Sequence, residues 1–387
     1  MKQRILILIL AVAVLLSIVV SWVFFFRQSQ PEMTDQELRL RIGQMLLVGF
    51  RGTEVTESAT IIRALRELNL GGVVLYDLDV PSGRTFPRNI VNPGQVQRLS
   101  RDLQRSSPTP LFIAIDVEGG KVNRLKPKYG FPEIPSAQEI GQGSAEQIER
   151  TADQLGQELA DLGINWDFAP VVDVNINPEN PVIGALGRSF SADPEQVAQD
   201  AAAFVRGLHQ SRIISCLKHF PGHGSSSEDS HLGLVDVTDS WQSEELIPYR
   251  ELIETGLADA VMTAHVMNRT VDPVYPATLS PLFLENLLRN TLLFQGVIVS
   301  DDMEMGAIVQ NFGFAEALVR AVNAGCDLLI LSNNGQTYDD EIAWKARDIL
   351  FTACKEGQIP PLKIWQASER IAQLKQRYGL LASPPVP

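Results

Sequence analysis

The stretch GVIVSDD, residues 296–302, decides the fold. Its first four residues are glycine or apolar, and three polar residues close it. A short, continuously apolar run of this kind is typical of a strand that is buried on both faces, as the strands of a parallel sheet are. Seven further runs share the pattern: MLLVGF (45–50), GGVVLY (71–76), LFIAID (111–116), INWDFAP (164–170), IISCLKHF (213–220), AVMTAHV (260–266) and CDLLILSN (326–333).

The segments between these runs have helical periodicity. In AEQIERTADQLGQELADLG (145–163) and DPEQVAQDAAAFVRGLHQ (193–210), apolar residues recur every three or four positions. Eight strands that alternate with amphipathic helices predict an α/β fold, a (β/α)8 barrel of the TIM type. We assign residues 35–380 to this barrel and residues 381–387 to a loose tail. A doubly wound open sheet is the alternative, but no apolar run leads into a GxGxxG turn.

The N-terminal stretch ILILILAVAVLLSIVVSWVFFF, residues 5–26, contains no charged residue. At about 1.5 Å per residue it is long enough to cross a hydrocarbon core of about 30 Å. Lys2 and Arg4 precede it, so the positive-inside rule places residues 1–4 in the cytoplasm and the rest of the chain outside. The sequence therefore predicts a single-pass transmembrane signal anchor in the cell membrane, a linker over residues 27–34, and an extracytoplasmic barrel. A cleaved signal peptide is the alternative, but no small-x-small cleavage site follows the run.

The composition restricts the class of partner. The net charge of the 387-residue chain is −13 at pH 7, and no cluster of Lys and Arg occurs in its body. Since binding a polyanion needs such a cluster, we exclude nucleic acid as a partner. The three cysteines are an odd number and lack CxxC spacing, so neither a disulfide framework nor a cysteine zinc site is indicated.

Polar residues gather where the predicted strands end. In a barrel of this type the active site lies at the carboxyl ends of the strands, because the loops there build that face. Acidic and basic residues close five of the runs: Asp116, Glu118, Asp167, Asp173, Lys218, His219, His265, Asp301 and Asp302. A single polar strand end can simply meet solvent, but their joint occurrence predicts a concave, carboxylate-rich site.

Three of the five histidines lie close together, and with Asp229 they could in principle bind zinc: His219, His223 and His231. They lack the HxxxH spacing of a helical zinc site, so we predict no metal. We expect His223, in the turn PGHG, to be structural and His265 to line the floor of the pocket.

Five motifs, taken in order, resemble those of glycoside hydrolase family 3: IAIDVEGGKVNRL (113–125), NPVIGALGRSF (180–190), KHFPGHG (218–224), DSH (229–231) and VIVSDDMEMGA (297–307). The likeness spans roughly residues 36–375. It is greatest to the bacterial β-N-acetylhexosaminidases of this family that act on peptidoglycan fragments. The resemblance implies a barrel enzyme without a cofactor.

The resemblance also implies which residues act. It makes Asp301 the catalytic nucleophile, and Asp302 is the rival carboxylate. His231 becomes the general acid/base with Asp229 as its partner. A histidine suits this role because its pKa lies near ~6.5 and a neighbouring carboxylate can orient it. The implied sugar-binding residues are Asp116, Arg124, Arg188, Lys218 and His219.

The function that follows is a retaining exo-β-N-acetylhexosaminidase that hydrolyses terminal GlcNAc from peptidoglycan-derived glycans or muropeptides. A phosphorylase with the same site is one alternative, because a histidine would not repel an incoming phosphate as a carboxylate would. Another β-glycosidase activity of family 3 is a second alternative, and a membrane-tethered, non-catalytic glycan-binding protein is a third. We expect a monomer.

Overall fold

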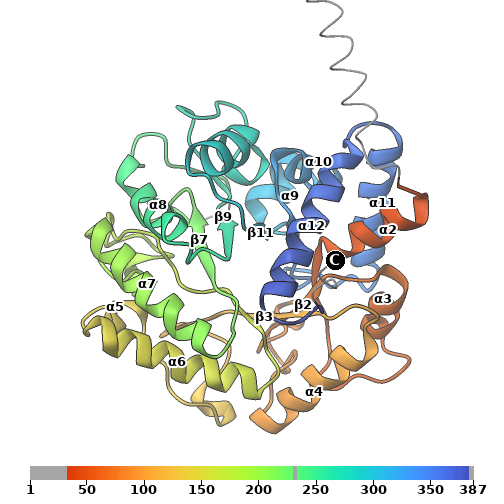
Figure 1. The fold of residues 1–387 in the computed structure, drawn as a ribbon, viewed down its shortest axis with the longest axis horizontal. Coiled ribbons are helices and arrows are strands. Elements are labelled where there is room, and N and C mark those ends of the chain that lie inside the picture. The colour runs from red at the N-terminus through yellow and green to blue at the C-terminus, as the bar shows by residue number, and fades with distance from the viewer. Residues whose placement is uncertain (1–32, 230–232, 383–387) are drawn as a thin grey trace, which may run out of the picture. The chain divides into compact units, whose positions relative to one another are not determined.

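The chain folds around one parallel sheet, which Figure 1 shows at the centre of the helices. The computed structural model describes residues 33–229 and 233–382. The strands of the sheet are β1 (Leu46–Gly49), β2 (Gly72–Leu75), β3 (Phe112–Ile115), β6 (Trp166–Asp167), β7 (Cys216–Phe220), β9 (Ala260–Thr263), β11 (Val297–Asp302) and β12 (Leu328–Leu331). Their order is β6-β3-β2-β1-β12-β11-β9-β7, and every pairing is parallel.

The two edge strands approach each other and nearly close the sheet. Isolated parallel bridges join Trp166 to Ile214 and Val171 to Lys218, and they link the segments of β6 and β7. The architecture is therefore an α/β fold with a nearly closed, barrel-like parallel sheet. Each strand lies within one of the eight apolar runs. The sequential strand order excludes the doubly wound open sheet, in which the order reverses at a switch point.

Helices lie on the outside of this sheet (Figure 1). The helices α6 (Ala145–Asp161) and α7 (Pro194–Gln210) coincide with the two periodic segments. The side chains of Ser144 and Asp193 accept hydrogen bonds at their first turns, where main-chain N–H groups have no partner within the helix. The other helices are α2 (Asp35–Gln44), α3 (Thr60–Leu68), α4 (Pro93–Ser106), α5 (Ala137–Ile140), α8 (Ile247–Glu254), α9 (Gly306–Phe312), α10 (Phe314–Ala324), α11 (Ile342–Lys355) and α12 (Pro361–Arg377).

Short elements fill the connections between strands and helices. Two small sheets pair β4 (Val117–Gly119) with β5 (Val122–Asn123), and β8 (Val235–Asp236) with β10 (Val266–Met267). The short helices are η1 (Val80–Ser82), η2 (Pro127–Tyr129), η3 (Gly184–Leu186), η4 (Ser243–Leu246), η5 (Ala277–Leu279) and the π-helix η6 (Leu282–Thr291). The small strands follow β3, β7 and β9 in the chain, so these connections lie at the carboxyl ends of the strands.

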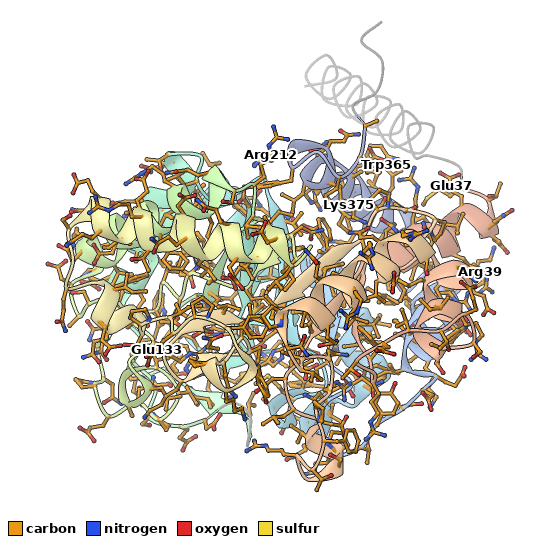
Figure 2. All side chains as sticks on the ribbon, turned by 90° about the horizontal axis from the view of Figure 1, so that it is seen from below. Glu37, Arg39, Glu133, Arg212, Trp365 and Lys375 are labelled. Carbon is orange, nitrogen blue, oxygen red and sulfur yellow. The ribbon has the colours of Figure 1, made fainter. Side chains whose placement is uncertain are left out.

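The core lies inside and around the sheet, because strands such as β3 and β12 are buried along their whole length. A buried lysine closes the side where the strands begin. The Nζ atom of Lys375 donates to Gln44 Oε1 at 2.8 Å and to the carbonyl oxygen of Gly71 at 3.0 Å. Figure 2 labels Lys375 and Arg212, which precedes β7, on this same side. The charged side chains described below lie at the opposite side, where the strands end.

The predicted transmembrane segment, residues 5–26, lies outside the described residues, as do residues 1–4 and residues 383–387 of the predicted tail. Within residues 33–229 and 233–382, no helix is long and apolar enough to cross a membrane.

Candidate active site

A buried lysine joins two carboxylates at the carboxyl ends of the strands. Lys218 lies in β7, Asp116 follows β3, and Glu118 lies in β4. The Nζ atom of Lys218 is 2.9 Å from Asp116 Oδ1 and 2.6 Å from Glu118 Oε1. The side chains of Lys218 and Glu118 are each 2% exposed. Since β6 lies between β3 and β7 where the sheet nearly closes, the lysine reaches past β6 to join the two acids.

Two arginines complete this cluster. The guanidinium of Arg188 donates through Nε and Nη2 to the two oxygens of Glu118, each at 2.7 Å. Its Nη1 donates to the carbonyl oxygen of Val182 at 2.7 Å. Arg124 donates through Nη2 to Asp116 Oδ2 at 3.3 Å. Three cations therefore surround two carboxylates.

These cations keep both carboxylates ionised. Burial raises the pKa of Asp116, but the charges of Lys218 and Arg124 outweigh burial and hold this pKa well below its ordinary value. Burial also raises the pKa of Glu118, and the charges of Arg188 and Lys218 lower it further than burial raises it. The two acids in turn raise the pKa of Lys218 in spite of its burial. The ammonium and both carboxylates thus remain charged at neutral pH.

The imidazole of His219 is fixed by an aspartate. Its Nδ1 lies 2.7 Å from Asp173 Oδ2, and its main-chain N–H donates to Asp173 Oδ1 at 3.1 Å. When Nδ1 carries the proton for this contact, Nε2 is the acceptor, and it lies 3.4 Å from Arg188 Nη2. His219 therefore presents Nε2 toward the cluster of Arg188 and Glu118.

His223 lies inside the turn that follows β7. Its Nδ1 is 2.7 Å from Ser226 Oγ, and its main-chain N–H donates to Asp173 at 2.8 Å. The amide of Asn180 donates to its carbonyl oxygen at 2.7 Å. Burial lowers the pKa of His223 to about 4, so the ring is neutral at neutral pH. These contacts agree with a structural role.

The two aspartates that end β11 have different surroundings. Asp302 accepts hydrogen bonds from the main-chain N–H of Ser332 at 3.0 Å and from Ser332 Oγ at 2.6 Å. Asp301 Oδ1 accepts from the main-chain N–H of Asp302 at 2.8 Å. Asp302 is therefore tied to the loop after β12, and both aspartates are half-buried at the strand end.

The imidazole of His265 contacts the main chain of this strand end. Its Nδ1 lies 2.8 Å from Thr278 Oγ1, and its Nε2 lies 2.9 Å from the carbonyl oxygen of Asp302. The side chain is fully buried. That His265 lines the floor of a pocket stays a prediction.

Three further acids belong to the site, and the sequence places them at strand ends without an individual role: Glu118, Asp167 and Asp173. Glu118 and Asp173 hold Arg188 and His219, as described above. Asp167, in β6, is fully buried and accepts from the main-chain N–H of Val117 at 2.9 Å. Burial raises the pKa of Asp167 well above its ordinary value. Their positions at strand ends were the available signal, but strand ends alone do not tell a supporting acid from one that binds substrate.

The structure thus brings together all five predicted sugar-binding residues: Asp116, Arg124, Arg188, Lys218 and His219. Of the predicted acid/base pair, Asp229 is half-buried in the loop after β7, and His231 lies outside the described residues. In residues 33–229 and 233–382, no three His, Cys, Asp or Glu side chains converge on a point where they could hold a metal ion.

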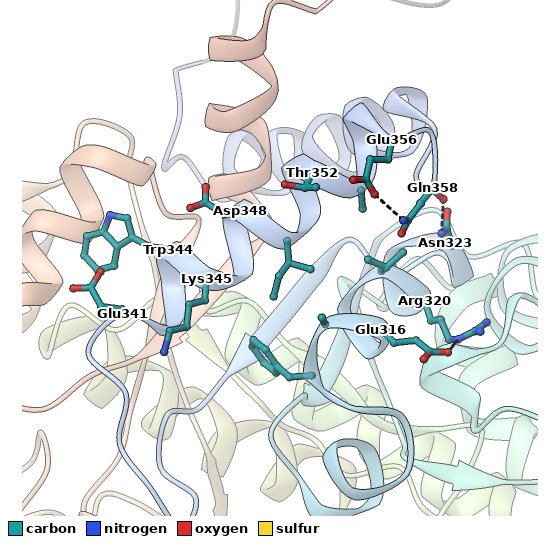
Figure 3. Close-up of a pocket in the computed structure, with 15 residues that line it drawn as sticks. Glu316, Arg320, Asn323, Glu341, Trp344, Lys345, Asp348, Thr352, Glu356 and Gln358 are labelled. Carbon is teal, nitrogen blue, oxygen red and sulfur yellow. Dashed lines mark hydrogen bonds and ion pairs between the residues drawn. The ribbon is translucent and has the colours of Figure 1, made fainter.

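One groove of the described residues lies away from this cluster. It has a volume of about 1130 Å³ and runs between α10 and α11 on the outside of the sheet. Figure 3 shows its lining, including Glu316, Arg320, Trp344 and Asp348. Its residues belong to helices and not to strand ends, so it is separate from the charged cluster.

Comparison with known proteins identifies the class. The family model described as glycosyl hydrolase family 3 N terminal domain matches residues 37–374. A beta-hexosaminidase of Tolumonas auensis is 37% identical over 295 residues, which cover 75% of this chain and 83% of the relative. A beta-hexosaminidase of Stenotrophomonas maltophilia strain K279a is 36% identical over 297 residues, covering 74% of this chain and 83% of the relative.

Two solved structures are also similar. A glycoside hydrolase family 3 beta-N-acetylglucosaminidase from Paenibacillus sp. FPU-7 has a TM-score of 0.81 and 38% identity, over 92% of this chain and 65% of that chain. A beta-N-acetylhexosaminidase from Beutenbergia cavernae has a TM-score of 0.78 and 27% identity, over 89% of this chain and 99% of that chain. These similarities identify the chain as a glycoside hydrolase. Among these enzymes, the chain belongs to glycosyl hydrolase family 3.

Proposed function

We propose that the chain is a retaining exo-β-N-acetylglucosaminidase that removes terminal GlcNAc from peptidoglycan-derived glycans or muropeptides. The activities named for its relatives support this proposal. The observation that carries it is the cluster of Asp116, Lys218, Glu118 and Arg188, held at 2.6–2.9 Å where the strands end. Such a cluster offers charged donors and acceptors to the hydroxyl groups of one sugar ring.

The proposed sugar contacts follow from the chemistry of these groups. Each oxygen of an ionised carboxylate has two lone pairs, so Asp116 can accept sugar hydroxyl protons while it keeps Lys218 and Arg124. The Nε2 atom of His219 and the Nη2 atom of Arg188 add an acceptor and a donor. Since these groups are already fixed by their neighbours, little ordering is needed when a sugar binds.

Asp301 is the proposed nucleophile. The two oxygens of Asp302 are engaged by Ser332, which leaves that side chain directed to the β12 loop. Asp301 precedes it on the same strand end, and adjacent strand residues point to opposite faces. This difference in hydrogen bonding and orientation supports Asp301, and not Asp302, as the nucleophile.

The proposed reaction has two steps. The carboxylate of Asp301 attacks the anomeric carbon while the bond to the leaving oxygen breaks, and His231 gives its proton to that oxygen. A water molecule then attacks the glycosyl ester, His231 takes its proton, and the Asp301 carboxylate is released. Asp229 would orient His231 and stabilise its protonated form.

The proposed location is the outer side of the cell membrane. Residues 5–26 would anchor the chain, residues 27–34 would link the anchor to the domain of residues 35–380, and the enzyme would act as a monomer. The support for this proposal is the uncharged run and the two basic residues that precede it.

The decisive experiment measures which substrates the full-length protein cleaves. Aryl β-N-acetylglucosaminide, aryl β-glucoside and purified muropeptides are compared with and without phosphate. The proposal expects GlcNAc release without phosphate and a β-anomer as the first product in a time course by NMR. Phosphate-dependent turnover would indicate the phosphorylase, preference for aryl glucoside another β-glycosidase, and no turnover a glycan-binding protein.

A further inference from the structure

Two connections pack against each other at the carboxyl ends of β6 and β7. The connection from β6 to α7, residues 168–193, contains Arg188, which binds Glu118 in the charged cluster. The turn after β7, residues 221–229, leads to the proposed acid/base pair. The two connections touch main chain to main chain, because a side chain on Gly224 would overlap the carbonyl oxygen of Val174. The position of each connection therefore depends on the other.

A fully buried asparagine, Asn180, holds the first of these connections. Its Oδ1 atom accepts from the main-chain N–H groups of Val182 at 2.9 Å and Ile183 at 3.0 Å. The carbonyl oxygens of the same two residues accept from Arg188, the first from Nη1 at 2.7 Å and the second from the main-chain N–H at 3.1 Å. The Oδ1 side of Asn180 therefore orders the two peptide groups that hold Arg188.

The amide nitrogen of Asn180 binds the turn after β7. It donates to the carbonyl oxygen of His223 at 2.7 Å, to Ser226 Oγ at 3.1 Å and to the carbonyl oxygen of Gly224 at 3.3 Å. The same hydroxyl group lies 2.7 Å from His223 Nδ1. Ser226 precedes Asp229 by three positions. The Nδ2 side of Asn180 therefore fixes the turn just before the proposed acid/base pair.

The orientation of this amide group follows from its partners. The main-chain N–H groups on one side can only donate, and the carbonyl oxygens on the other side can only accept. A single planar group must therefore accept on one side and donate on the other, as an asparagine side chain does. Asn177 adds a second bond between the two connections, because its Nδ2 donates to the carbonyl oxygen of Ser226 at 2.8 Å.

We propose that Asn180 is a positioning residue that couples sugar binding to proton transfer. It holds Arg188 in the sugar-binding cluster and at the same time places the turn that leads to Asp229 and His231. Asn180 is fully buried, so it acts through these neighbours and not by contact with the substrate. A small displacement of a proton donor lowers the rate strongly, because the donor must lie within hydrogen-bond reach of the leaving oxygen. This inference rests on the proposed function.

The variant Asn180→Asp, in the full-length protein, separates the two sets of contacts. Its carboxyl group keeps an acceptor for the two main-chain N–H groups but lacks the amide donors to the turn. We expect kcat/KM to fall about thirtyfold on an unactivated GlcNAc disaccharide, and about threefold or less on an activated aryl β-N-acetylglucosaminide, which needs little proton donation. The inhibition constant of free GlcNAc, which reports on the Arg188 side, should stay within about twofold.

Two further variants test whether this loss passes through the acid/base pair. Ser226→Ala removes the hydroxyl group that accepts from Asn180, and it should give a smaller loss that again depends on the leaving group. In a His231→Ala background, Asn180→Asp should lower kcat/KM on the disaccharide by about threefold or less, because the positioned proton donor is already gone. If Asn180→Asp does not fold, Ser226→Ala decides: a loss that is equal for both substrates would contradict the proposal.

The matched control is Asn165→Asp, on the side where the strands begin. Asn165 likewise accepts from a main-chain N–H group, that of Ile113 at 2.9 Å, and donates to a carbonyl oxygen, that of Leu111 at 2.9 Å. Its replacement should leave the ratio of the two activities unchanged. Equal losses on both substrates in Asn180→Asp, or a loss that persists in full without His231, would overturn the proposal. A wild-type protein that releases no GlcNAc from any substrate would instead refute the proposed function.

Discussion

The guanidinium of Arg188 binds the carboxylate of Glu118 through two hydrogen bonds of 2.7 Å. Their side chains are 10% and 2% exposed, so solvent screens the pair little. Lys218 shares the same carboxylate at 2.6 Å. One glutamate therefore compensates two buried cations that we propose to contact the sugar.

Replacing Glu118 should destabilise the protein. In Glu118→Gln the charges of Arg188 and Lys218 lose a buried partner, and we expect the free energy of unfolding to fall by about 3 kcal/mol. Chemical denaturation measures this change. The matched control is Glu316→Gln, which removes an exposed Glu–Arg pair and should cost less than about 0.5 kcal/mol. Equal losses of unfolding free energy in the two variants would show that the buried pair stabilises the protein no more than the exposed pair does.

Replacing the proposed nucleophile, Asp301, should greatly reduce turnover. We expect Asp301→Ala to lower kcat on an aryl β-N-acetylglucosaminide by at least about a thousandfold, because the proposed mechanism forms the glycosyl ester on this carboxylate. Asp302→Asn keeps the shape of the side chain that binds Ser332 and should cost about tenfold or less. Full activity in Asp301→Ala, or a larger loss of kcat in Asp302→Asn than in Asp301→Ala, would show that Asp301 is not the nucleophile.

The effect of His231→Ala should depend on the leaving group. A poor leaving group needs a proton from the general acid, so we expect a loss of about a hundred- to ten-thousandfold in kcat on disaccharides. An activated aryl leaving group needs little help, and the first step on such a substrate should change much less. The control is His209→Ala, which lies before β7 and away from the carboxyl ends of the strands. It should not alter the ratio of activity on activated leaving groups to activity on poor ones. A uniform loss over all leaving groups would argue against proton donation by His231.

Glu245 should make stability depend on pH. This fully buried residue accepts from the main-chain N–H of Gly224 at 3.1 Å, and burial, reinforced by the charge of Asp173, raises its pKa to about 7. The folded state therefore holds a proton that the unfolded state loses near pH 4.5. The stabilising effect is fully present below about pH 4.5 and is lost as the pH rises to about 7.

The size of this change should be roughly 3 kcal/mol, from 1.36 kcal/mol per pKa unit. Glu245→Gln should flatten the curve of unfolding free energy against pH between about 4.5 and 7. Glu244→Gln, which changes the exposed neighbouring residue, should leave the curve as in the wild type. Identical pH profiles for Glu245→Gln and the wild type would show that Glu245 ionises normally.

Much of the fold could be predicted because burial leaves a local pattern. Each of the eight strands lies within a short apolar run, since a strand of a parallel sheet is covered on both faces. The helices α6 and α7 were predictable from the spacing of their apolar residues. The neighbouring strands of the sheet were predictable as well, because successive strand–helix units usually lie side by side.

The partners within the site could not be predicted in this way. Ser332 and Asp302 meet although 30 residues separate them, and this contact, which no local pattern encodes, distinguishes Asp302 from Asp301. The same is true of Asp167, whose burial beside Val117 depends on the pairing of β6 with β3. Sequence spacing indicates that a strand end is polar. It does not indicate which side chain holds a neighbouring residue in position and which one faces the substrate.

By itself, the sequence determined the class of this protein: parallel strands, polar residues where they end, and the motifs of a glycosidase family. Only the tertiary structure decided which charged side chains pair with one another. Lys218 and Asp116 are 102 residues apart, and Arg188 and Glu118 are 70 apart. Their pairing depends on how the sheet curves until β6 and β7 nearly meet. Electrostatic energy depends on distances in space and on exclusion of water, and both arise only when the sheet closes around the cluster.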